Sequence, residues 1–360
     1  MGDPMRVGIV GTGQISGQYL KTLPRLTNLR LTAVADLDID RAAAIAPPGV
    51  RALSPSALYA ADDVDILLNL TIPAAHQEVA LAAIAAGKST YGEKPLAPNK
   101  KQAREILDAA ANAGVAVGCA PDTVLGTGVQ TARAALDAGE IGRPIAATAF
   151  MTTPGHERWH PAPEFYYQPG GGPLLDMGPY YLTALVHLLG PVRRVVGMSA
   201  TPQATRTTNT GRTFPVDVAT HVTGVLEHAD GALSTLLMSF DVWAAQLPRI
   251  EVYGTGGSLS VPDPNGFHGQ ARIFRAGGES WADLPESGGY PNAARGYGLA
   301  DLARAIRTGG QPRASGDLAF HVLDVMESLL AAAETGTSIT ITSDVARPAP
   351  VPLGARPEEV

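Results

Sequence analysis

The pattern of apolar and polar positions divides the chain into two parts. Over the first 120 residues, short continuous apolar runs alternate with amphipathic stretches rich in Ala and Leu. Continuous apolar runs are typical of parallel strands that helices cover on both faces of a sheet. The strands predicted in this way are 6–10, 29–35, 66–70, 89–91 and 115–119. The clearest helices are predicted over 74–86 and 100–113, and each ends near a glycine that can form a left-handed cap.

The rest of the chain has many short strand patterns and few helical ones. Strands are predicted over 143–153, 192–201, 217–227, 231–240, 248–254 and 270–275. One long helix interrupts this series at 175–189, and two more follow at about 297–307 and 317–334. The predicted fold class is therefore α/β, with an N-terminal doubly wound parallel sheet and a C-terminal α+β domain built on a large, mostly antiparallel open sheet.

The length of the chain favours two domains, because single cores stop growing well below 360 residues. We place the first domain at 1–121 and the second at 122–346, and the terminal helices can pack back on the first. The proline-rich segment 347–360 is expected to be a surface tail.

Charge and composition exclude several functions. The chain has 27 Lys and Arg residues against 34 Asp and Glu. It has no cluster of Lys and Arg that could bind along a phosphate backbone, so no nucleic-acid partner is expected. No apolar run reaches the roughly 18 residues of a membrane span, and no signal-peptide pattern precedes the first strand, so a cytoplasmic location is expected. The single cysteine, Cys119, lies in an apolar run and is expected to be a core thiol.

The turn after the first predicted strand is a candidate cofactor site. Gly11 and Gly13 lie in this turn, Gln14 and Ile15 begin the next helix, and Ser16 stands where the usual fingerprint has a third glycine. Gly11 permits a tight turn, and Gly13 lets a backbone amide approach a pyrophosphate that the helix dipole stabilises. The pattern predicts a dinucleotide-binding Rossmann domain.

Asp36 follows the second predicted strand, at about the 20-residue spacing where an acid accepts hydrogen bonds from the adenosine ribose. A carboxylate there repels a 2′-phosphate, and no arginine comes immediately after it, so NAD is predicted in preference to NADP. A turn-forming aspartate is the alternative interpretation, and the glycine turn upstream favours the cofactor role.

Lys94 is the candidate catalytic residue. The segment Gly92-Glu93-Lys94-Pro95 follows the predicted strand 89–91, and the carboxyl ends of parallel strands open into the cofactor crevice. Pro95 restricts the backbone of Lys94, and an ammonium there can hydrogen-bond a reacting oxygen and transfer its proton. In isolation, a surface lysine after a strand would be the simpler interpretation.

The order and spacing of these motifs resemble the Gfo/Idh/MocA family of dehydrogenases. The likeness runs through Thr71, Pro73 and His76, the Glu93-Lys94-Pro95 motif, the segment 120–123, and a glycine-rich segment at 170–172 that leads to Asp176 and Tyr180. The resemblance covers nearly the whole chain. It implies an N-terminal Rossmann domain, a C-terminal domain whose open sheet commonly forms the oligomer interface, and sugars, cyclitols or their derivatives as substrates.

The resemblance also implies roles for individual residues. Thr71, Pro73, His76 and Glu93 would belong to the cofactor site, Lys94 would be the catalytic lysine and Asp176 a substrate-binding acid. Tyr180 stands four residues after Asp176, where many members have histidine, so a phenol would take part in proton transfer. Helical i,i+4 spacing puts Asp176 and Tyr180 on one helix face. Whether Lys94 or Tyr180 finally carries the proton stays open.

The polar and aromatic segment 156–160 is predicted to contact the substrate through Trp159 and His160. Its sequence, His-Glu-Arg-Trp-His, also matches the His-Glu-x-x-His zinc pattern. That pattern requires a helix, and prolines on both sides of this segment oppose one, so no metal site is predicted.

The predicted function is an NAD-dependent oxidoreductase that interconverts a secondary alcohol and a ketone on a sugar, cyclitol or related polyol, with Lys94 and Tyr180 handling the proton. An NAD-dependent glycoside hydrolase that oxidises its sugar transiently is the first alternative, and a non-catalytic nucleotide-sensing regulator is the second. The joint presence of Lys94, Asp176 and Tyr180 speaks against the regulator. A homo-oligomer, either dimer or tetramer, is expected.

Overall fold

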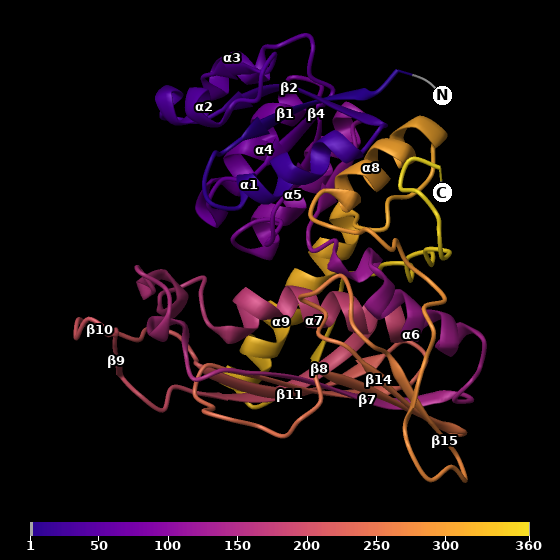
Figure 1. Cartoon of the computed structure of the whole chain (residues 1–360). Helices are drawn as coiled ribbons and strands as arrows, with labels where there is room; N and C mark the ends of the chain where they lie inside the picture. The colour runs from indigo at the N-terminus through magenta and orange to yellow at the C-terminus, as the bar shows by residue number, and fades with distance from the viewer. Residues whose placement is uncertain (1–2, 360) are drawn as a thin grey trace. The chain divides into compact units, whose positions relative to one another are not determined.

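The structure is a computed structural model that describes residues 3–359, and the chain forms two compact units. The first unit comprises the chain up to Gly126, the segment Gly289–Phe320 and the residues from Val351 onward. The second unit comprises Thr127–Gly288 and His321–Pro350. Figure 1 labels their helices and strands.

A six-stranded parallel sheet forms the centre of the first unit. Its strand order is β3-β2-β1-β4-β5-β6, so the sheet grows outward in both directions from β1 and β4. This order is that of a doubly wound Rossmann sheet, and the predicted fold class is confirmed. The strands are β1 (Met5–Val10), β2 (Leu29–Ala35), β3 (Arg51–Leu53), β4 (Ile66–Asn69), β5 (Ser89–Gly92) and β6 (Val117–Cys119).

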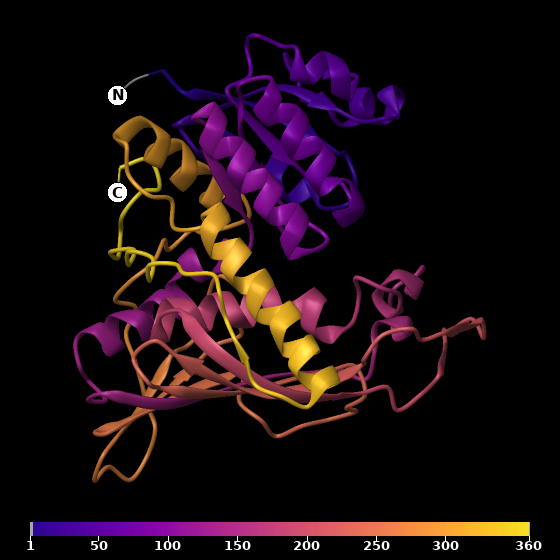
Figure 2. The same cartoon turned by 180° about the vertical axis from the view of Figure 1, so that it is seen from behind.

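Helices cover this sheet, and their boundaries follow local capping chemistry. In α5 (Lys100–Ala113), the side chain of Asn99 accepts from the N–H of Gln102 at the start, and Gly114 ends the helix with φ of 67°. Figure 2 shows α5 beside α4 (His76–Ala85). The other helices of this unit are α1 (Ser16–Thr22), α2 (Ile39–Ile45), α3 (Pro55–Tyr59), α8 (Tyr297–Thr308) and the first residues of α9 (Gly316–Thr335).

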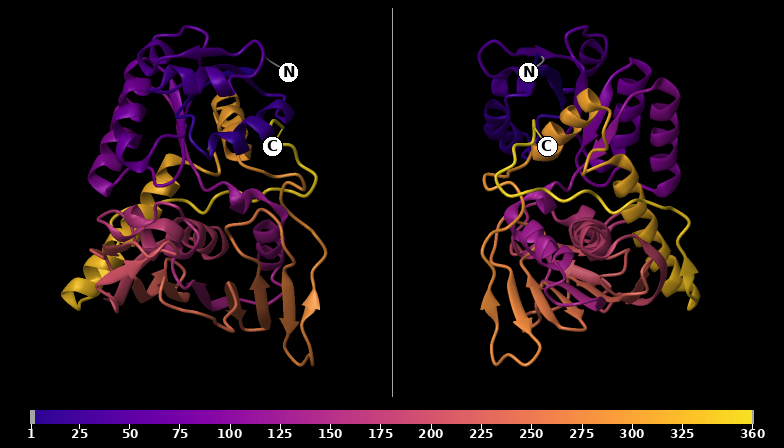
Figure 3. Two further views of the ribbon diagram at one scale, coloured as in Figure 1. Left: turned by 60° about the vertical axis from the view of Figure 1, so that its left-hand side comes forward. Right: turned by 90° about the vertical axis from the view of Figure 1, so that its right-hand side faces the viewer.

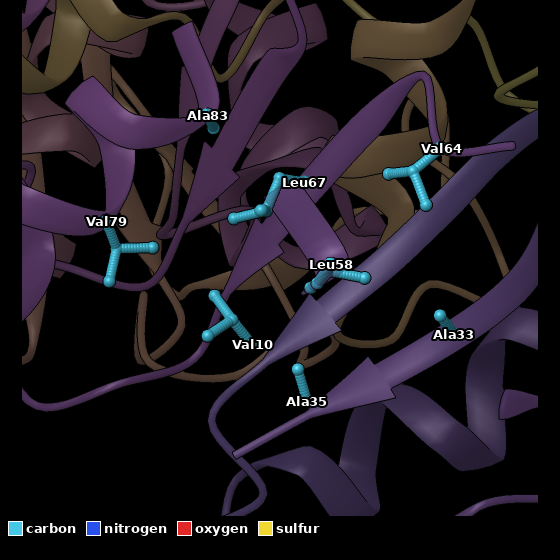
Figure 4. Close-up of a cluster of buried hydrophobic side chains, with 8 residues drawn as sticks. All are labelled: Val10, Ala33, Ala35, Leu58, Val64, Leu67, Val79 and Ala83. Carbon is cyan, nitrogen blue, oxygen red and sulfur yellow. The ribbon is translucent and has the colours of Figure 1, made fainter. Parts of the chain in front are cut away.

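A cluster of small and branched side chains fills the space between the sheet and its helices (Figure 4). Strands β1, β2 and β4 contribute to it, together with Leu58 of α3 and Val79 and Ala83 of α4. Burial of each Val or Leu side chain in this cluster stabilises the fold by about 1.5–3 kcal/mol, which fixes the sheet whose carboxyl edge carries the candidate site.

A nine-stranded mixed sheet forms the second unit, in the order β16-β15-β14-β13-β7-β12-β11-β8-β17. Neighbouring strands pair antiparallel except β7 and β12, which run parallel, so the prediction of a mostly antiparallel sheet is confirmed. The strands are β7 (Pro144–Thr152), β8 (Val192–Ala200), β11 (His221–His228), β12 (Leu233–Ser239), β13 (Ile250–Gly254), β14 (Gly257–Val261), β15 (Arg272–Arg275), β16 (Ala282–Asp283) and β17 (Ile339–Thr340).

Among the residues that the structure describes, helices cover only one face of this sheet. Figure 3 shows α6 (Thr127–Asp137), α7 (Pro173–Leu189) and the later turns of α9 on the same side. Gly197 of β8 and Gly224 of β11 pair with each other, and a Cβ on either would lie within 2.6 Å of Leu329 of α9. Glycine at both positions therefore lets α9 pack closely against the strands. Across residues 3–359, no helix has the length and apolar character needed to cross a bilayer.

Candidate active site

The glycine turn after β1 has the shape that a dinucleotide requires. Gly11 has φ of +92°, and a Cβ on it would lie 2.7 Å from the backbone of Leu70, so only glycine fits. A Cβ on Gly13 would meet no atom within 4 Å, so there is open space beside the backbone of this residue. The small Ser16 is buried and donates to the carbonyl of Gly13 at 2.7 Å. Gln14 is exposed and Ile15 half-buried at the start of α1.

Asp36 completes this turn as an ionised group. Its Oδ2 accepts from the N–H of Thr12 at 2.8 Å and from the Thr12 hydroxyl at 2.6 Å, and its Oδ1 accepts from the N–H of Asp38. Partial burial alone would raise the pKa of Asp36, but these hydrogen bonds and the charge of Arg41 lower it below its ordinary value. Arg41 approaches Asp36 from α2, at 3.8 Å, a neighbour that the sequence analysis did not identify.

Lys94 follows β5, at the carboxyl edge of the sheet that also carries the glycine turn and Asp36. Its backbone N–H donates to Glu93 Oε2 at 3.2 Å, and Glu93 Oε1 accepts from the hydroxyl of Tyr19 at 2.9 Å. The Lys94-Pro95 peptide bond is cis. The pairing of Tyr19 with Glu93 joins residues 74 positions apart, which no local sequence pattern signals.

His76 is buried between two loops. Its Nδ1 lies 2.6 Å from the carbonyl oxygen of Pro95 and its Nε2 lies 3.1 Å from that of Thr71. Burial lowers the pKa of His76 more than the two carbonyls raise it, so the ring is neutral at neutral pH. The ring thus ties the segment after Lys94 to the loop after β4.

Asn69, the last residue of β4, also fixes the loop that follows this strand, and the sequence analysis did not identify it. The backbone N–H and hydroxyl of Thr71 donate to Asn69 Oδ1 at 3.1 and 2.6 Å. Pro73 follows at an exposed position and begins a short 3-10 turn.

A buried acid lies in the segment after β6, near Glu93. Asp122 is fully buried and accepts from the N–H groups of Gly296 and Gly298 at 2.9 and 3.0 Å. Burial raises the pKa of Asp122 against the lowering effect of Arg295 and of these hydrogen bonds. Cys119 is buried as predicted, and burial raises the pKa of its thiol.

In the second unit, the glycine-rich segment leads directly into α7. A Cβ on Gly171 would lie 2.6 Å from the carbonyl oxygens of Phe165 and Tyr166, and Gly172 has φ of +90°. These glycines permit the tight turn that begins the helix. Asp176 lies in the first turn of α7, and Tyr180 follows one turn later with a buried side chain. Lys94 belongs to the first unit, whereas Asp176 and Tyr180 belong to the second.

His156 contacts Asp176, a pairing that the sequence analysis missed. The distance from His156 Nε2 to Asp176 Oδ2 is 2.9 Å. Aromatic rings enclose the imidazole, with Tyr166 and Phe240 at centroid distances of 4.4 Å and Trp159 at 5.2 Å. Trp159 itself is 64% exposed, and His160 is half-buried beside it. The only sequence signal for this cluster was the density of polar and aromatic residues in 156–160.

The His-Glu-x-x-His segment forms a three-residue 3-10 turn at His156–Arg158 rather than an α-helix. Its Glu157 belongs to a buried ionic network. Arg206, from the β9 strand (Thr205–Thr207), contacts Glu157 Oε1 at 3.3 Å and pairs with Asp241. The hydroxyl of Tyr167 donates to the other Glu157 oxygen. This network fixes the segment between β7 and α7.

A glycine turn that only glycine can form, open space beside it and an ionised acid at the end of β2 define the first unit as the NAD-binding domain of an oxidoreductase. Comparison with known proteins agrees. Residues 5–120 match the oxidoreductase family with an NAD-binding Rossmann fold, and residues 129–260 match the GFO/IDH/MocA C-terminal domain. The chain belongs to the GFO/IDH/MocA family of oxidoreductases, as the resemblance predicted.

Individual relatives support this assignment. The 1,5-anhydro-D-fructose reductase of Ensifer adhaerens is 30% identical over 93% of this chain and 98% of its own length. Inositol 2-dehydrogenase 3 of Saccharopolyspora erythraea is 35% identical over 42% of this chain and 46% of its own. An NAD-binding oxidoreductase from Klebsiella pneumoniae has the same fold, with a TM-score of 0.82 at 22% identity, covering 95% of this chain and 100% of that one.

Proposed function

We propose that this protein catalyses reversible oxidation of a secondary alcohol on a sugar, cyclitol or related polyol. The observation that carries the proposal is the position of Lys94, which follows β5 at the sheet edge that holds the glycine turn and Asp36. An ammonium at that edge lies where the cofactor's reactive end meets a substrate in doubly wound folds. The names of the two relatives, an anhydrofructose reductase and an inositol dehydrogenase, support a ring-shaped polyhydroxylated substrate.

In this proposal the residues of the first unit bind the cofactor. Gly11, Gly13, Gln14 and Ile15 surround the pyrophosphate, and Asp36 accepts from the ribose. Thr71 and Pro73 line the cofactor from the loop after β4. His76 and Glu93 act by holding the two loops, because their polar atoms bond Thr71, Pro95, Lys94 and Tyr19. NAD, when bound, supplies the hydride acceptor.

Lys94, Asp176 and Tyr180 act on the substrate. The hydroxyl proton passes either to Lys94 in its neutral amine form or, with Lys94 as an ammonium that hydrogen-bonds the reacting oxygen, to Tyr180 as the alcohol becomes a ketone. Asp176 accepts from a neighbouring substrate hydroxyl, Trp159 presents a face on which a sugar ring can stack, and His160 bonds a further hydroxyl.

The proposal is tested by following cofactor reduction over a panel of cyclitols, sugars, anhydrosugars and glycosides. We expect NAD-dependent turnover with one group of polyols, and a loss of about 100-fold or more in kcat for Lys94→Ala. Lys101→Ala, an exposed lysine of α5, is the matched control and retains full activity. Comparing Lys94→Ala with Tyr180→Phe across pH identifies the proton carrier, since the group that accepts the hydroxyl proton must be deprotonated and its loss removes the acidic limb of the oxidation profile.

Two outcomes would refute the proposal. Full activity of Lys94→Ala would show that the proton is handled elsewhere. Binding of NAD without polyol oxidation would favour the other hypotheses, and release of sugar from a glycoside at constant NADH absorbance would identify a hydrolase.

We also propose that the protein is a homo-oligomer that associates through the uncovered face of the second unit's sheet. Apolar side chains are exposed there on adjacent strands, including Val196 and Met198 of β8, Val225 of β11 and Leu233 of β12. Val196 and Val225 are paired across the strands, so the apolar surface is continuous. Light scattering of wild type and Met198→Glu tests this proposal, with a smaller species expected for the variant and an unchanged mass contradicting it.

A further inference from the structure

The carboxylate of Asp176 is held by a histidine from a different element. His156 lies in the 3-10 turn between β7 and α7, twenty residues earlier in the chain, and its Nε2 contacts Asp176 Oδ2 at 2.9 Å. The two side chains are 10% and 14% exposed, so water competes little for this hydrogen bond. An isolated aspartate on the first turn of a helix would otherwise choose among several rotamers.

The surroundings of the ring fix which nitrogen carries the proton. Within residues 3–359, no hydrogen-bond partner lies near the buried Nδ1 of His156. A carboxylate oxygen can only accept, so Nε2 of His156 carries a proton and donates it to Asp176. The rings of Tyr166 and Phe240, both at 4.4 Å, stop the imidazole from turning away.

The backbone of His156 is anchored as well. Its N–H donates to the hydroxyl of Tyr167 at 3.1 Å, and that hydroxyl donates to Glu157. Glu157 in turn pairs with Arg206, which also pairs with Asp241. A chain of buried interactions thus runs from the ionic network through Tyr167 to the imidazole and ends at the carboxylate.

We propose that His156 is a positioning residue for the reaction: its Nε2–H holds the Asp176 carboxylate in one rotamer, one helical turn before Tyr180, ready to accept from a substrate hydroxyl. This inference rests on the proposed polyol oxidation. It assigns a specific role to a residue that the sequence analysis considered only as part of the substrate-contacting segment 156–160 and of a zinc pattern.

The test uses variants that separate the donor from the volume of the ring. His156→Leu keeps an apolar side chain of similar size and removes the donor, whereas the amide of His156→Gln can still donate near the position of Nε2. We expect kcat/KM for the polyol to fall about 10- to 100-fold in His156→Leu and by less than about threefold in His156→Gln. The dissociation constant of NADH should stay unchanged in both. His268→Leu, an exposed histidine of the same unit, is the control.

A double-mutant cycle separates positioning from a general effect on folding. In the Asp176→Ala background no side-chain acceptor remains to be held, so His156→Leu should cost less than about threefold there. Equal losses in both backgrounds, or failure of His156→Gln to rescue a folded protein, would overturn the positioning role while leaving the dehydrogenase intact. A wild type that oxidises no polyol would overturn both the proposed function and this inference.

Discussion

The buried histidine His321 should make the stability of the second unit depend on pH. His321 lies in α9, and its Nε2 accepts a hydrogen bond of 3.0 Å from the backbone N–H of Val192. The ring proton is therefore on Nδ1, which donates to the hydroxyl of Ser343 at 2.8 Å. Protonation of Nε2 would destroy the acceptor that Val192 needs. Burial accordingly lowers the pKa of His321 from 6.5 to about 4, despite two nearby carboxylates.

The size of the effect follows from these two pKa values. In the unfolded chain the imidazole binds a proton near pH 6.5, but in the folded unit it does so only near pH 4. Below pH 6.5 the unfolded state therefore holds more protons, so stability is complete above this pH and falls as the pH falls toward 4. His321 alone lowers the free energy of unfolding by about 2 kcal/mol at pH 5, and by roughly 3 kcal/mol once both states are protonated.

Urea unfolding followed by tryptophan fluorescence measures this loss in the appropriate unit, because Trp159, Trp243 and Trp281 all lie in the second unit. The comparison is with His321→Gln, whose amide can accept from Val192 and donate to Ser343 without titrating. Between pH 7.5 and 5, the wild type should lose about 2 kcal/mol more than the variant.

His228, whose pKa is also lowered by burial, is present in both proteins. Its charge contributes to the lowered pKa of His321, so the difference between the two proteins includes this coupling. His268→Gln, at an exposed position, serves as the control and should follow the wild type. If wild type and His321→Gln lost the same stability across this range, the assigned tautomer and the linkage argument would both be wrong.

Three further perturbations test separate parts of the structure. Asp36→Ser removes the negative charge that opposes a 2′-phosphate, so the kcat/KM ratio of NADP to NAD should rise about tenfold or more, and an unchanged ratio would contradict the cofactor assignment. Gly118→Ala would place a Cβ 2.6 Å from the fully buried ring of Tyr91, and should lower stability by about 1–3 kcal/mol in thermal unfolding followed by circular dichroism. An unchanged thermal midpoint would mean that the Tyr91 ring moves aside without a loss of stability. Arg206→Met leaves Glu157 buried without its cation, and should cost about 3–5 kcal/mol in urea unfolding; a midpoint equal to that of wild type would assign no stability to the network.

Long periodic segments were predicted well from the sequence. The helix expected over 100–113 is α5 (Lys100–Ala113), and the helix expected over 175–189 is α7, which begins two residues earlier at Pro173. Both carry strong local signals, a capping asparagine and a proline at the first turn. The strand predicted over 217–227 begins only at His221, because the backbone N–H of Asp217 donates to the carbonyl of Tyr167 rather than to a neighbouring strand of the sheet.

Short elements were missed because their stability comes from neighbours rather than from their own sequence. Strand β3 has three residues and pairs only with β2, at one edge of the parallel sheet. Strand β14 begins at Gly257, in a glycine-rich segment whose composition indicates a turn. Its pairing with β13 and β15 supplies the hydrogen bonds that its composition does not predict.

The same distinction explains which residues of the proposed site the sequence analysis could predict. Gly11, Asp36 and Lys94 each follow a strand of the parallel sheet, so one local pattern and one topological rule suffice to find them. His156 could not be found in this way, since its partner Asp176 is twenty residues away, beyond a turn whose path depends on the Glu157 network. The two residues meet because the fold buries both side chains side by side, and no regular sequence spacing connects them.

His76 shows how a motif residue can act by holding two loops together. Motif matching grouped it with the cofactor contacts, but its two ring nitrogens face the carbonyls of Thr71 and Pro95. A neutral ring has one proton and therefore donates to one of the two carbonyls at a time. Any residue that replaces His76 must supply a donor to the carbonyl of Thr71, beside the proposed cofactor site, or to that of Pro95, beside Lys94. The histidine thus couples the segment that follows Lys94 to the loop after β4.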